Sequence, residues 1–129
     1  MGSQLIRLAE DRETALRVGY DATDWVRKPP YGDYEDSLSE WDVRLMEASG
    51  EPIGAVYTHG PEFHVSVVPE WHGRWATRSI LRQIIPEPVA FTQVIPGYEH
   101  VVGYLYRLGF GWAGNKDGTQ YFVRYKHAN

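Results

Sequence analysis

The sequence of 129 residues contains no cysteine. This absence excludes a disulfide framework, a thiolate zinc site and a cysteine nucleophile, so stability must come from an apolar core. The sequence also lacks an apolar run of about 18 residues, and its N-terminus lacks the charged and then apolar stretches of a secretory signal. We therefore expect a cytoplasmic protein that has no membrane partner.

The sequence is rich in aromatic residues, which make up 14% of the chain, and 43% of all residues are hydrophobic. This composition supplies an aromatic-rich core, and the length leaves room for one domain. We expect a single domain over residues 1–129. The five histidines do not have the spacing of a metal site, because no repeated carboxylate or histidine pattern accompanies them. We expect no metal.

The net charge of −4 is unevenly distributed along the chain. Residues 1–62 contain 13 acidic and 6 basic residues, whereas residues 63–129 contain 4 acidic and 7 basic residues. The acidic first half argues against nucleic acid as a partner, and the mildly basic second half suits a small anionic ligand. Two differently solvated surfaces would explain the same distribution.

Hydrophobic periodicity and turn residues predict a mixed α/β chain. Strands 63–68 and 89–95 flank a helix and should therefore run parallel to one another. Asp11 is the expected N-cap of the first helix, and Gly109 the expected C-terminal stop of the last. The expected strands are 5–9, 41–48, 52–58, 63–68, 89–95, 110–113 and 119–125, and the expected helices are 13–20, 33–38, 74–85 and 98–108.

The segment between strand 63–68 and helix 74–85 is the expected ligand site. A strand that passes through a glycine-containing turn into a helix leaves backbone N–H groups without partners, and the helix dipole adds positive charge there. Such a turn suits an anion such as a pyrophosphate.

Three phrases of the sequence resemble the GNAT superfamily of acetyl-CoA-dependent N-acetyltransferases. Val67-Val68-Pro69-Glu70 is followed by His72-Gly73-Arg74-Trp75-Ala76-Thr77, where the family reads Arg-Gly-Arg-Gly-x-Gly. Leu105-Tyr106-Arg107-Leu108-Gly109-Phe110 is similar to the family's phrase before its final hairpin, and Gly50-Glu51-Pro52-Ile53-Gly54 to its turn between the second and third strands. The resemblance implies an α/β (α+β) fold with a mixed, mostly antiparallel sheet of six to seven strands and about four helices.

The resemblance also implies a cofactor and its binding residues. Acetyl-CoA would lie between the strands that end at Val68 and Ile95, and the backbone of Val67 and Val68 would pair with the pantetheine amides. The pyrophosphate would be held by His72, Gly73, Arg74, Trp75, Ala76 and Thr77. Arg74 would also begin a helical stripe with Arg78 and Arg82, of which Arg74 suits a phosphate best.

The same resemblance implies roles in catalysis. Tyr106 matches the tyrosine that protonates the departing thiolate in many family members, although a ring that only packs on the sheet is equally consistent with this position. An amine acceptor also needs a proton acceptor, and Glu62 and His64 border the relevant strand. His64 is equally consistent with a histidine on the sheet surface.

Departures from the family pattern leave two functions open. Trp75 and Thr77 stand where the family prefers glycine or alanine, His72 replaces arginine or glutamine, and an indole at position 75 can cover the loop. One function is an N-acetyltransferase in which an amine attacks acetyl-CoA directly. The alternative is an eroded GNAT-like protein that serves as a phage virion component or an interaction module. The acceptor and the existence of a homodimer also remain open.

Overall fold

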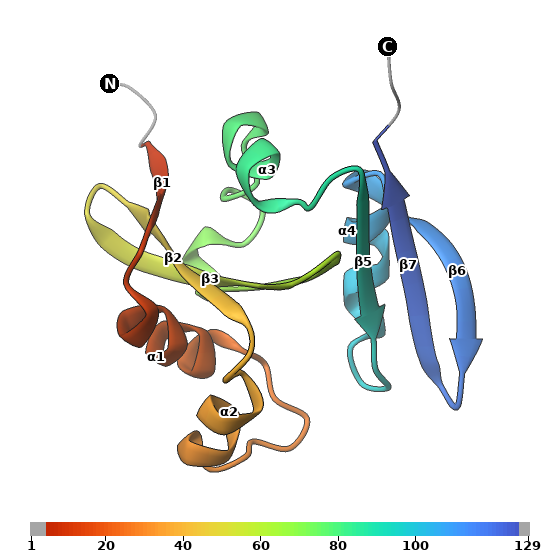
Figure 1. Ribbon diagram of the computed structural model, residues 1–129, viewed down its shortest axis with the longest axis horizontal. Coiled ribbons are helices and arrows are strands. Elements are labelled where there is room, and N and C mark those ends of the chain that lie inside the picture. Colours follow the sequence, from red (N-terminus) through yellow and green to blue (C-terminus); the bar gives the residue numbers. More distant parts are fainter. Residues whose placement is uncertain (1–4, 127–129) are drawn as a thin grey trace. The chain divides into compact units, whose positions relative to one another are not determined.

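The structure, a computed structural model, describes residues 5–126, and its helices and strands follow the order expected from the sequence (Figure 1). We predicted a single domain over residues 1–129, and its residues 1–4 and 127–129 lie outside the part of the chain that the structure describes. Two 3₁₀ turns, η1 and η2, were not expected. The elements are β1 Ile6–Ala9, α1 Arg12–Ala22, α2 Tyr31–Ser37, β2 Asp42–Ala48, β3 Glu51–His59, β4 Glu62–Val67, η1 Pro69–Trp71, α3 Arg78–Ile84, β5 Val89–Val94, η2 Glu99–Val101, α4 Val102–Arg107, β6 Gly111–Lys116 and β7 Thr119–Tyr125.

Within the described residues the strands form a seven-stranded, mostly antiparallel sheet in the order β1-β2-β3-β4-β5-β7-β6. The parallel pair β4–β5 is confirmed by the register Glu62↔Phe91. The chain divides into two units, which are described in turn. The first comprises residues up to His59 together with His64–Ile84, and the second comprises Gly60–Phe63 and the residues from Ile85 onward.

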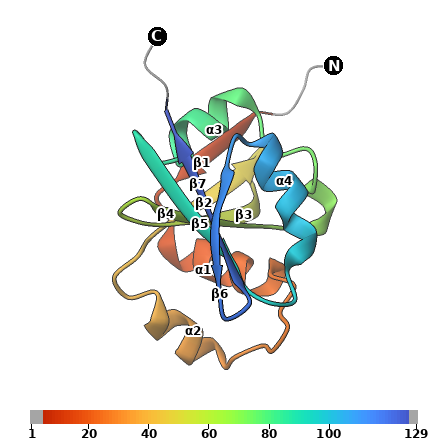
Figure 2. The same ribbon diagram turned by 90° about the vertical axis from the view of Figure 1, so that its right-hand side faces the viewer.

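In the first unit, helices cover both faces of the strands. Figures 1 and 2 show α1 and α3 on opposite sides of β2 and β3. The burial pattern of β3 agrees, because the consecutive residues 53–57 are all buried although neighbouring side chains of a strand point to opposite faces. Helix α1 begins at the expected cap, where the Asp11 carboxylate accepts a hydrogen bond from the Thr14 amide at 3.2 Å.

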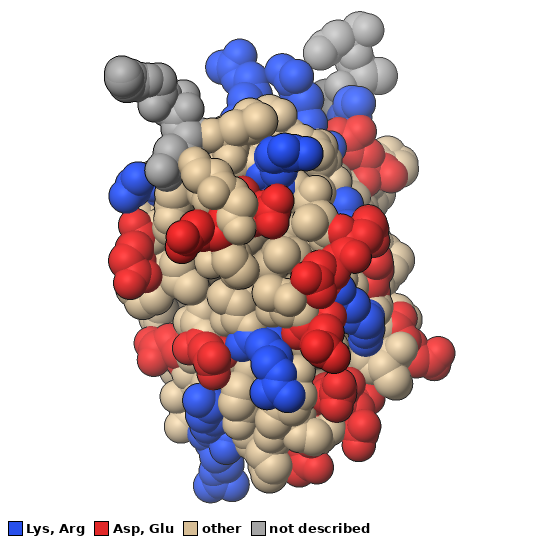
Figure 3. Space-filling model, turned by 90° about the vertical axis from the view of Figure 1, so that its left-hand side faces the viewer, with Lys and Arg blue, Asp and Glu red and all other residues tan. Residues whose placement is uncertain are grey.

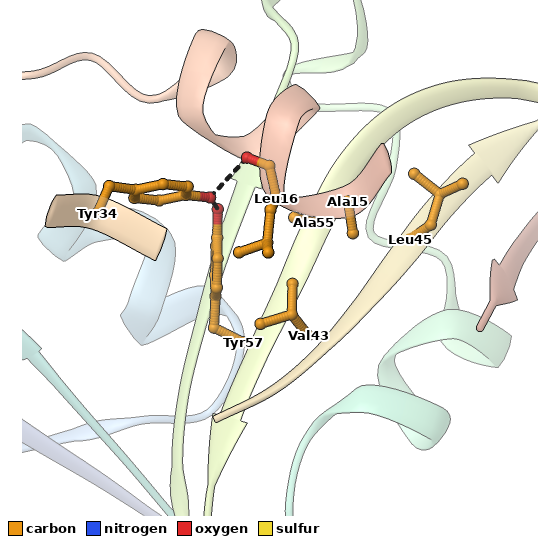
Figure 4. Close-up of a cluster of buried hydrophobic side chains, with 7 residues drawn as sticks. All are labelled: Ala15, Leu16, Tyr34, Val43, Leu45, Ala55 and Tyr57. Atoms are coloured by element: carbon orange, nitrogen blue, oxygen red, sulfur yellow. Dashed lines mark hydrogen bonds between the residues drawn. The ribbon is translucent and has the colours of Figure 1, made fainter. Parts of the chain in front are cut away.

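The buried cluster beneath α1 is apolar except for a row of hydroxyl groups (Figure 4). The Tyr34 hydroxyl donates to the carbonyl of Leu16 at 2.7 Å and lies 2.8 Å from the Tyr57 hydroxyl. Tyr57 also hydrogen-bonds Ser66 on β4, and the Ser66 hydroxyl lies 2.8 Å from that of Thr23. The row therefore connects α2, β3, β4 and the end of α1.

Close contacts at two glycines hold this row in place. A Cβ added to Gly19 of α1 would overlap the Tyr57 hydroxyl, and a Cβ added to Gly54 of β3 would lie 2.6 Å from the carbonyl oxygen of Ser66. Only glycine therefore lets α1 lie on Tyr57 and lets β4 lie this close to β3.

In the second unit, α4 packs on one face of the strands β5, β7 and β6 (Figure 2). The ring of Tyr106 lies edge-on to Phe122, with the centroids 5.8 Å apart. Gly109, with φ at +95°, ends the helix as expected, and the Phe110 amide closes it by donating to the Leu105 carbonyl at 3.0 Å. Strand β6 continues to Lys116, further than expected, and the hairpin turn is Asp117-Gly118.

The surface of the first unit reflects its acidic composition. Figure 3 shows more acidic than basic side chains on the face that it draws, with the two signs interspersed. No helix among residues 5–126 is both long enough and apolar enough to span a membrane.

Replacing Gly19 with alanine is expected to lower the free energy of unfolding by about 2–4 kcal/mol, because the added methyl group displaces the Tyr57 hydroxyl and breaks its hydrogen bonds. Gly103→Ala is the matched control, since Gly103 is also helical but has nothing within 4 Å of an added Cβ. It should stabilise the protein by about 0.5–1 kcal/mol. Urea unfolding measures both, and equal effects would contradict the assigned contact.

Stability is expected to fall as the pH rises above about 10. Burial raises the pKa of the Tyr34 and Tyr57 phenols in the folded state, so the folded protein retains protons that the unfolded chain loses. The stabilisation is therefore complete below the unfolded pKa and is lost above it, at up to about 1.4 kcal/mol per pH unit for each tyrosine. Tyr34→Phe should make the alkaline decline in unfolding free energy less steep, and an unchanged slope would refute this origin.

Candidate functional site

The loop between β4 and α3 is built by short-range backbone hydrogen bonds. The 3₁₀ turn η1 follows Val68, whose carbonyl accepts from the Trp71 amide at 3.0 Å, and the Arg74 amide donates to the Trp71 carbonyl at 3.0 Å. Gly73 has φ at +78°, a conformation that side chains other than glycine rarely adopt. The turn over 72–74 therefore depends on the glycine that the sequence motif contains.

The prediction that the helix after this loop starts at Arg74 was wrong, because α3 begins at Arg78. The Thr77 hydroxyl accepts from the Ile80 amide at 3.2 Å and acts as the cap, and the Thr77 amide donates to the Trp75 carbonyl at 2.8 Å. The expected stripe of three arginines is consequently broken, since Arg74 precedes the helix that carries Arg78 and Arg82.

The loop amides differ in their availability to a ligand. Those of Arg74 and Thr77 donate within the loop, whereas those of Gly73 and Ala76 donate to no acceptor among the described residues. Gly73 is also exposed, and nothing lies within 4 Å of a Cβ built on it. The loop therefore presents two N–H donors, at positions 73 and 76, to an anion.

Trp75 is directed into the protein, with only 5% of its surface exposed. The sequence suggested that an indole at this position can cover the loop, but the indole is buried and does not lie over the outer surface of the loop. Arg74 is exposed, Ala76 is half-buried and Thr77 is exposed. The tryptophan that replaces the family's glycine at position 75 therefore adds a large side chain to the core.

The backbone groups expected to bind pantetheine already make hydrogen bonds. The Val68 amide donates to the Ile53 carbonyl at 2.8 Å, which extends the β3–β4 ladder by one residue. The Val67 carbonyl accepts from Nε2 of His72 at 2.8 Å. A carbonyl has two lone pairs, so the Val67 oxygen keeps one acceptor site. His72 ties the loop to the end of β4, a contact that sequence reasoning missed.

The exposed Arg74 and the half-buried Trp71 form a pair on the same loop. The Arg74 guanidinium lies over the Trp71 ring, 4.3 Å from its centroid, and donates to the Glu70 carbonyl at 3.3 Å. These contacts hold the positive charge of Arg74 over Trp71 and Glu70, in the turn that precedes Gly73. Sequence reasoning did not single out Trp71, and an arginine three residues after a tryptophan in a tight turn is the signal that could have identified the pair.

The two expected proton acceptors belong to different units. His64, in the first unit, packs its ring at a tilt against Trp41, with the centroids 5.7 Å apart. Glu62, in the second unit, accepts from the Gln93 side-chain amide at 3.4 Å. Both side chains are half-buried.

Tyr106, the expected acid, lies on α4 in the second unit and keeps 52% of its surface exposed while one ring edge contacts Phe122. Two residues earlier, burial raises the pKa of the Tyr104 phenol to about 12, against a smaller lowering by Arg107. The packing of α4 therefore buries much of the Tyr104 phenol and leaves more than half of Tyr106 exposed, a difference that the sequence does not show.

Several solved structures share this fold. An acetyltransferase from Thermus thermophilus matches with a TM-score of 0.70 at 14% identity, covering 93% of this chain and 96% of that one. The PaiA N-acetyltransferase from Thermoplasma acidophilum in complex with coenzyme A matches with a TM-score of 0.66 at 12% identity over 94% and 99%. A putative acetyltransferase from Salmonella typhimurium with its cofactor acetyl-CoA matches with a TM-score of 0.62 at 16% identity over 99% and 96%.

No protein-family model matches the sequence, and no curated protein sequence matches it. At these identities the structural matches establish the fold, and the resemblance to N-acetyltransferases drawn from the three sequence phrases is confirmed at that level.

Trp75→Ala is expected to lower the free energy of unfolding by about 3–5 kcal/mol, as for other large buried side chains that leave a cavity. Trp71→Ala, in the same loop but half-buried, should lower it by about 1 kcal/mol. Chemical denaturation compares the two. A loss for Trp75→Ala as small as that for Trp71→Ala would place the indole outside the core.

Proposed function

We propose that the protein binds acetyl-CoA and transfers its acetyl group to an amine. The observation that carries this proposal is the loop 72–77, with its exposed Gly73 and its two available amides, on the fold of the N-acetyltransferases. Two of the structural neighbours bind coenzyme A and acetyl-CoA, respectively.

The loop suits the pyrophosphate in both shape and charge. The amides of Gly73 and Ala76 can each donate to a phosphate oxygen, and the absence of a side chain at Gly73 lets the phosphate approach the backbone. Exposed guanidinium groups of Arg74 and Arg78 can supply the charge-assisted hydrogen bonds. Four donor groups thereby stand within six residues of chain.

Strand β4 would bind the pantetheine arm through its backbone. The Val67 carbonyl can accept a second hydrogen bond beside that of His72, whereas the Val68 amide is engaged with Ile53. For the Val68 amide to polarise the thioester carbonyl, it would have to give up this hydrogen bond to Ile53. His72 would position Val67 by holding its carbonyl.

When bound, acetyl-CoA supplies an activated acyl group as a thioester. The reaction forms an N–C bond and breaks the C–S bond, so the amine must lose a proton and the departing sulfur must gain one. We assign the first task to Glu62 or His64 and the second to Tyr106. The acidic first half of the chain would favour a cationic acceptor.

The alternative, an interaction module without turnover, is favoured by one observation. The Arg74, Thr77 and Val68 amides are all engaged within the protein, which leaves fewer donors than the sequence motif suggests. Binding and turnover are therefore tested separately.

Binding is tested by thermal or chemical unfolding with and without acetyl-CoA. At about 100-fold excess over the dissociation constant, stability should rise by about 2.7 kcal/mol, and acetyl-pantetheine, which lacks the pyrophosphate, should give a smaller rise at the same concentration. Gly73→Ala should lose the acetyl-CoA effect. Gly60→Ala is matched to it, because Gly60 also has a positive φ and open space around an added Cβ, and it should keep the effect.

Turnover is tested by release of free thiol from acetyl-CoA in the presence of a panel of amines, and Tyr106→Phe should lower the rate without weakening binding. No stabilisation by acetyl-CoA would refute the cofactor. Stabilisation without thiol release from any amine would support the interaction module, and full activity of Tyr106→Phe would remove tyrosine from the chemistry.

A further inference from the structure

Side chains from three strands of the second unit meet on the side of the sheet that faces away from α4, here called the outer face. Helix α4 contacts Phe122 of β7, so Tyr121, the preceding residue, lies on the outer face. Gln93 of β5 pairs with Tyr121 and shares this face, as does Phe91 two residues before it. Glu62 of β4 pairs with Phe91 and lies there too. The outer face therefore brings a carboxylate, an amide and two aromatic rings together.

Contacts among these side chains place the carboxylate beside the rings. The Gln93 side-chain amide donates to the Glu62 carboxylate at 3.4 Å. The rings of Phe91 and Tyr121 stack with their centroids 5.9 Å apart and their planes at 19°. The Phe91 amide donates to the Pro61 carbonyl at 2.7 Å, which fixes β5 beside the start of β4. Gln93 thus touches the carboxylate on one side and stands next to Tyr121 on the other, since cross-strand neighbours have Cβ atoms about 5 Å apart.

Strand β6 contributes no side chain opposite Tyr121. Gly114 pairs with Tyr121 and Gly111 pairs with Val123, and nothing lies within 4 Å of a Cβ built on Gly114. The side chains that form the group are all half-buried, so each keeps an exposed part, namely Glu62, Phe91, Gln93 and Tyr121. Solvent therefore reaches part of the carboxylate side chain and part of both rings, and so can a small molecule.

The charge on this part of the outer face favours a cation. The residues that β5 and β7 place there are uncharged, namely Val89, Phe91, Gln93, Tyr121, Val123 and Tyr125. Lys116, which β6 adds on this side, pairs with Thr119 at the hairpin end. The carboxylate of Glu62 can form a charge-assisted hydrogen bond with an ammonium group. Because the Gln93 amide donates to Glu62 through its nitrogen, its carbonyl oxygen can accept from the same ammonium group.

We propose that the outer face binds the acceptor of the acetyl group and selects a primary amine that carries an aromatic group. The ammonium group pairs with the Glu62 carboxylate, and the aromatic group packs on Tyr121, whose ring is held in its orientation by Phe91. This role rests on the proposed function, within which it defines the class of acceptor and selects Glu62 from the two candidate proton acceptors. Tyr121 then determines specificity, and Phe91 is a positioning residue.

Binding is measured first without acetyl-CoA, by NMR titration of the full chain with three probes. Phenylethylamine has both an ammonium group and a ring, butylamine lacks the ring, and phenylethanol lacks the charge. Phenylethylamine should bind most tightly and each of the others about 5-fold more weakly, because an aromatic pair and an ion pair each contribute about that factor. Equal affinities for phenylethylamine and butylamine would overturn the proposal, as would failure of phenylethylamine to bind.

Two variants separate the ring from the charge, and circular dichroism melts verify that they fold. Tyr121→Leu should weaken phenylethylamine binding about 5-fold and leave butylamine unchanged. Glu62→Gln keeps an oxygen that can accept from Gln93, so it should weaken both amines about 5-fold and leave phenylethanol unchanged. Tyr125→Leu is the matched control, because Tyr125 lies on the same face but pairs with Val89 and is 64% exposed, and it should bind all three probes like the wild type. Wild-type affinity of Tyr121→Leu for phenylethylamine would contradict the assignment.

Turnover distinguishes this proposal from the proposed function. Thiol release from acetyl-CoA should show a lower KM for phenylethylamine than for butylamine, and Tyr121→Leu should raise the KM for phenylethylamine about 5-fold with little change in kcat. If acetyl-CoA neither binds nor reacts, the proposed function fails, while the amine titration still decides whether the outer face binds aromatic amines. If both amines react equally well and Tyr121→Leu has no effect, the proposed function stands and the aromatic selection is refuted.

Discussion

The hydroxyl of Tyr57 lies at the junction on which the first unit depends. It stands over Gly19 of α1, contacts Tyr34 of α2 at 2.8 Å and hydrogen-bonds Ser66 of β4. A polar group in this position must be fully hydrogen-bonded, because an unsatisfied buried hydroxyl costs about 1–3 kcal/mol. Two helices and two strands are thereby held to one geometry, and β4 is the strand that leads into the loop 72–77.

The loop inherits its shape from this arrangement. Gly54 allows β4 to lie against β3, the Val68 amide extends that ladder to Ile53, and His72 then returns to the Val67 carbonyl. Trp75 anchors the other end of the loop in the core. Between these two contacts Gly73 and Arg74 are exposed, and the available Ala76 amide follows directly after Trp75.

Local signals in the sequence were sufficient for the order of elements. Asp11 before an amphipathic stretch and Gly109 after one each specify a helix end through their own backbone chemistry, whereas the hairpin turn, expected over residues 115–118, is shorter because β6 continues to Lys116. The start of α3 was missed because Ala76 has helical spacing to Ile80, whereas the Thr77 cap and the inward turn of Trp75 depend on the packed core. The hydroxyl row could not be predicted from local sequence either, since Thr23 and Ser66 are 43 residues apart and only the fold brings them together. The motif predicted the position of the candidate loop. It did not predict which amides of the loop are free to donate to a ligand.

The hydroxyl row has a further property that appears when its protons are counted. Thr23, Ser66, Tyr57 and Tyr34 contribute one hydroxyl proton each, yet the row has a contact at every step from the Gly19 carbonyl through these four oxygens to the Leu16 carbonyl. The row thus has five oxygen–oxygen contacts but only four hydroxyl protons, so at any moment one contact contains no proton and is not a hydrogen bond. The vacancy can occupy different positions as the hydroxyls rotate together. The heavy atoms that hold β4 can thus be fixed while the protons between them are shared among several arrangements.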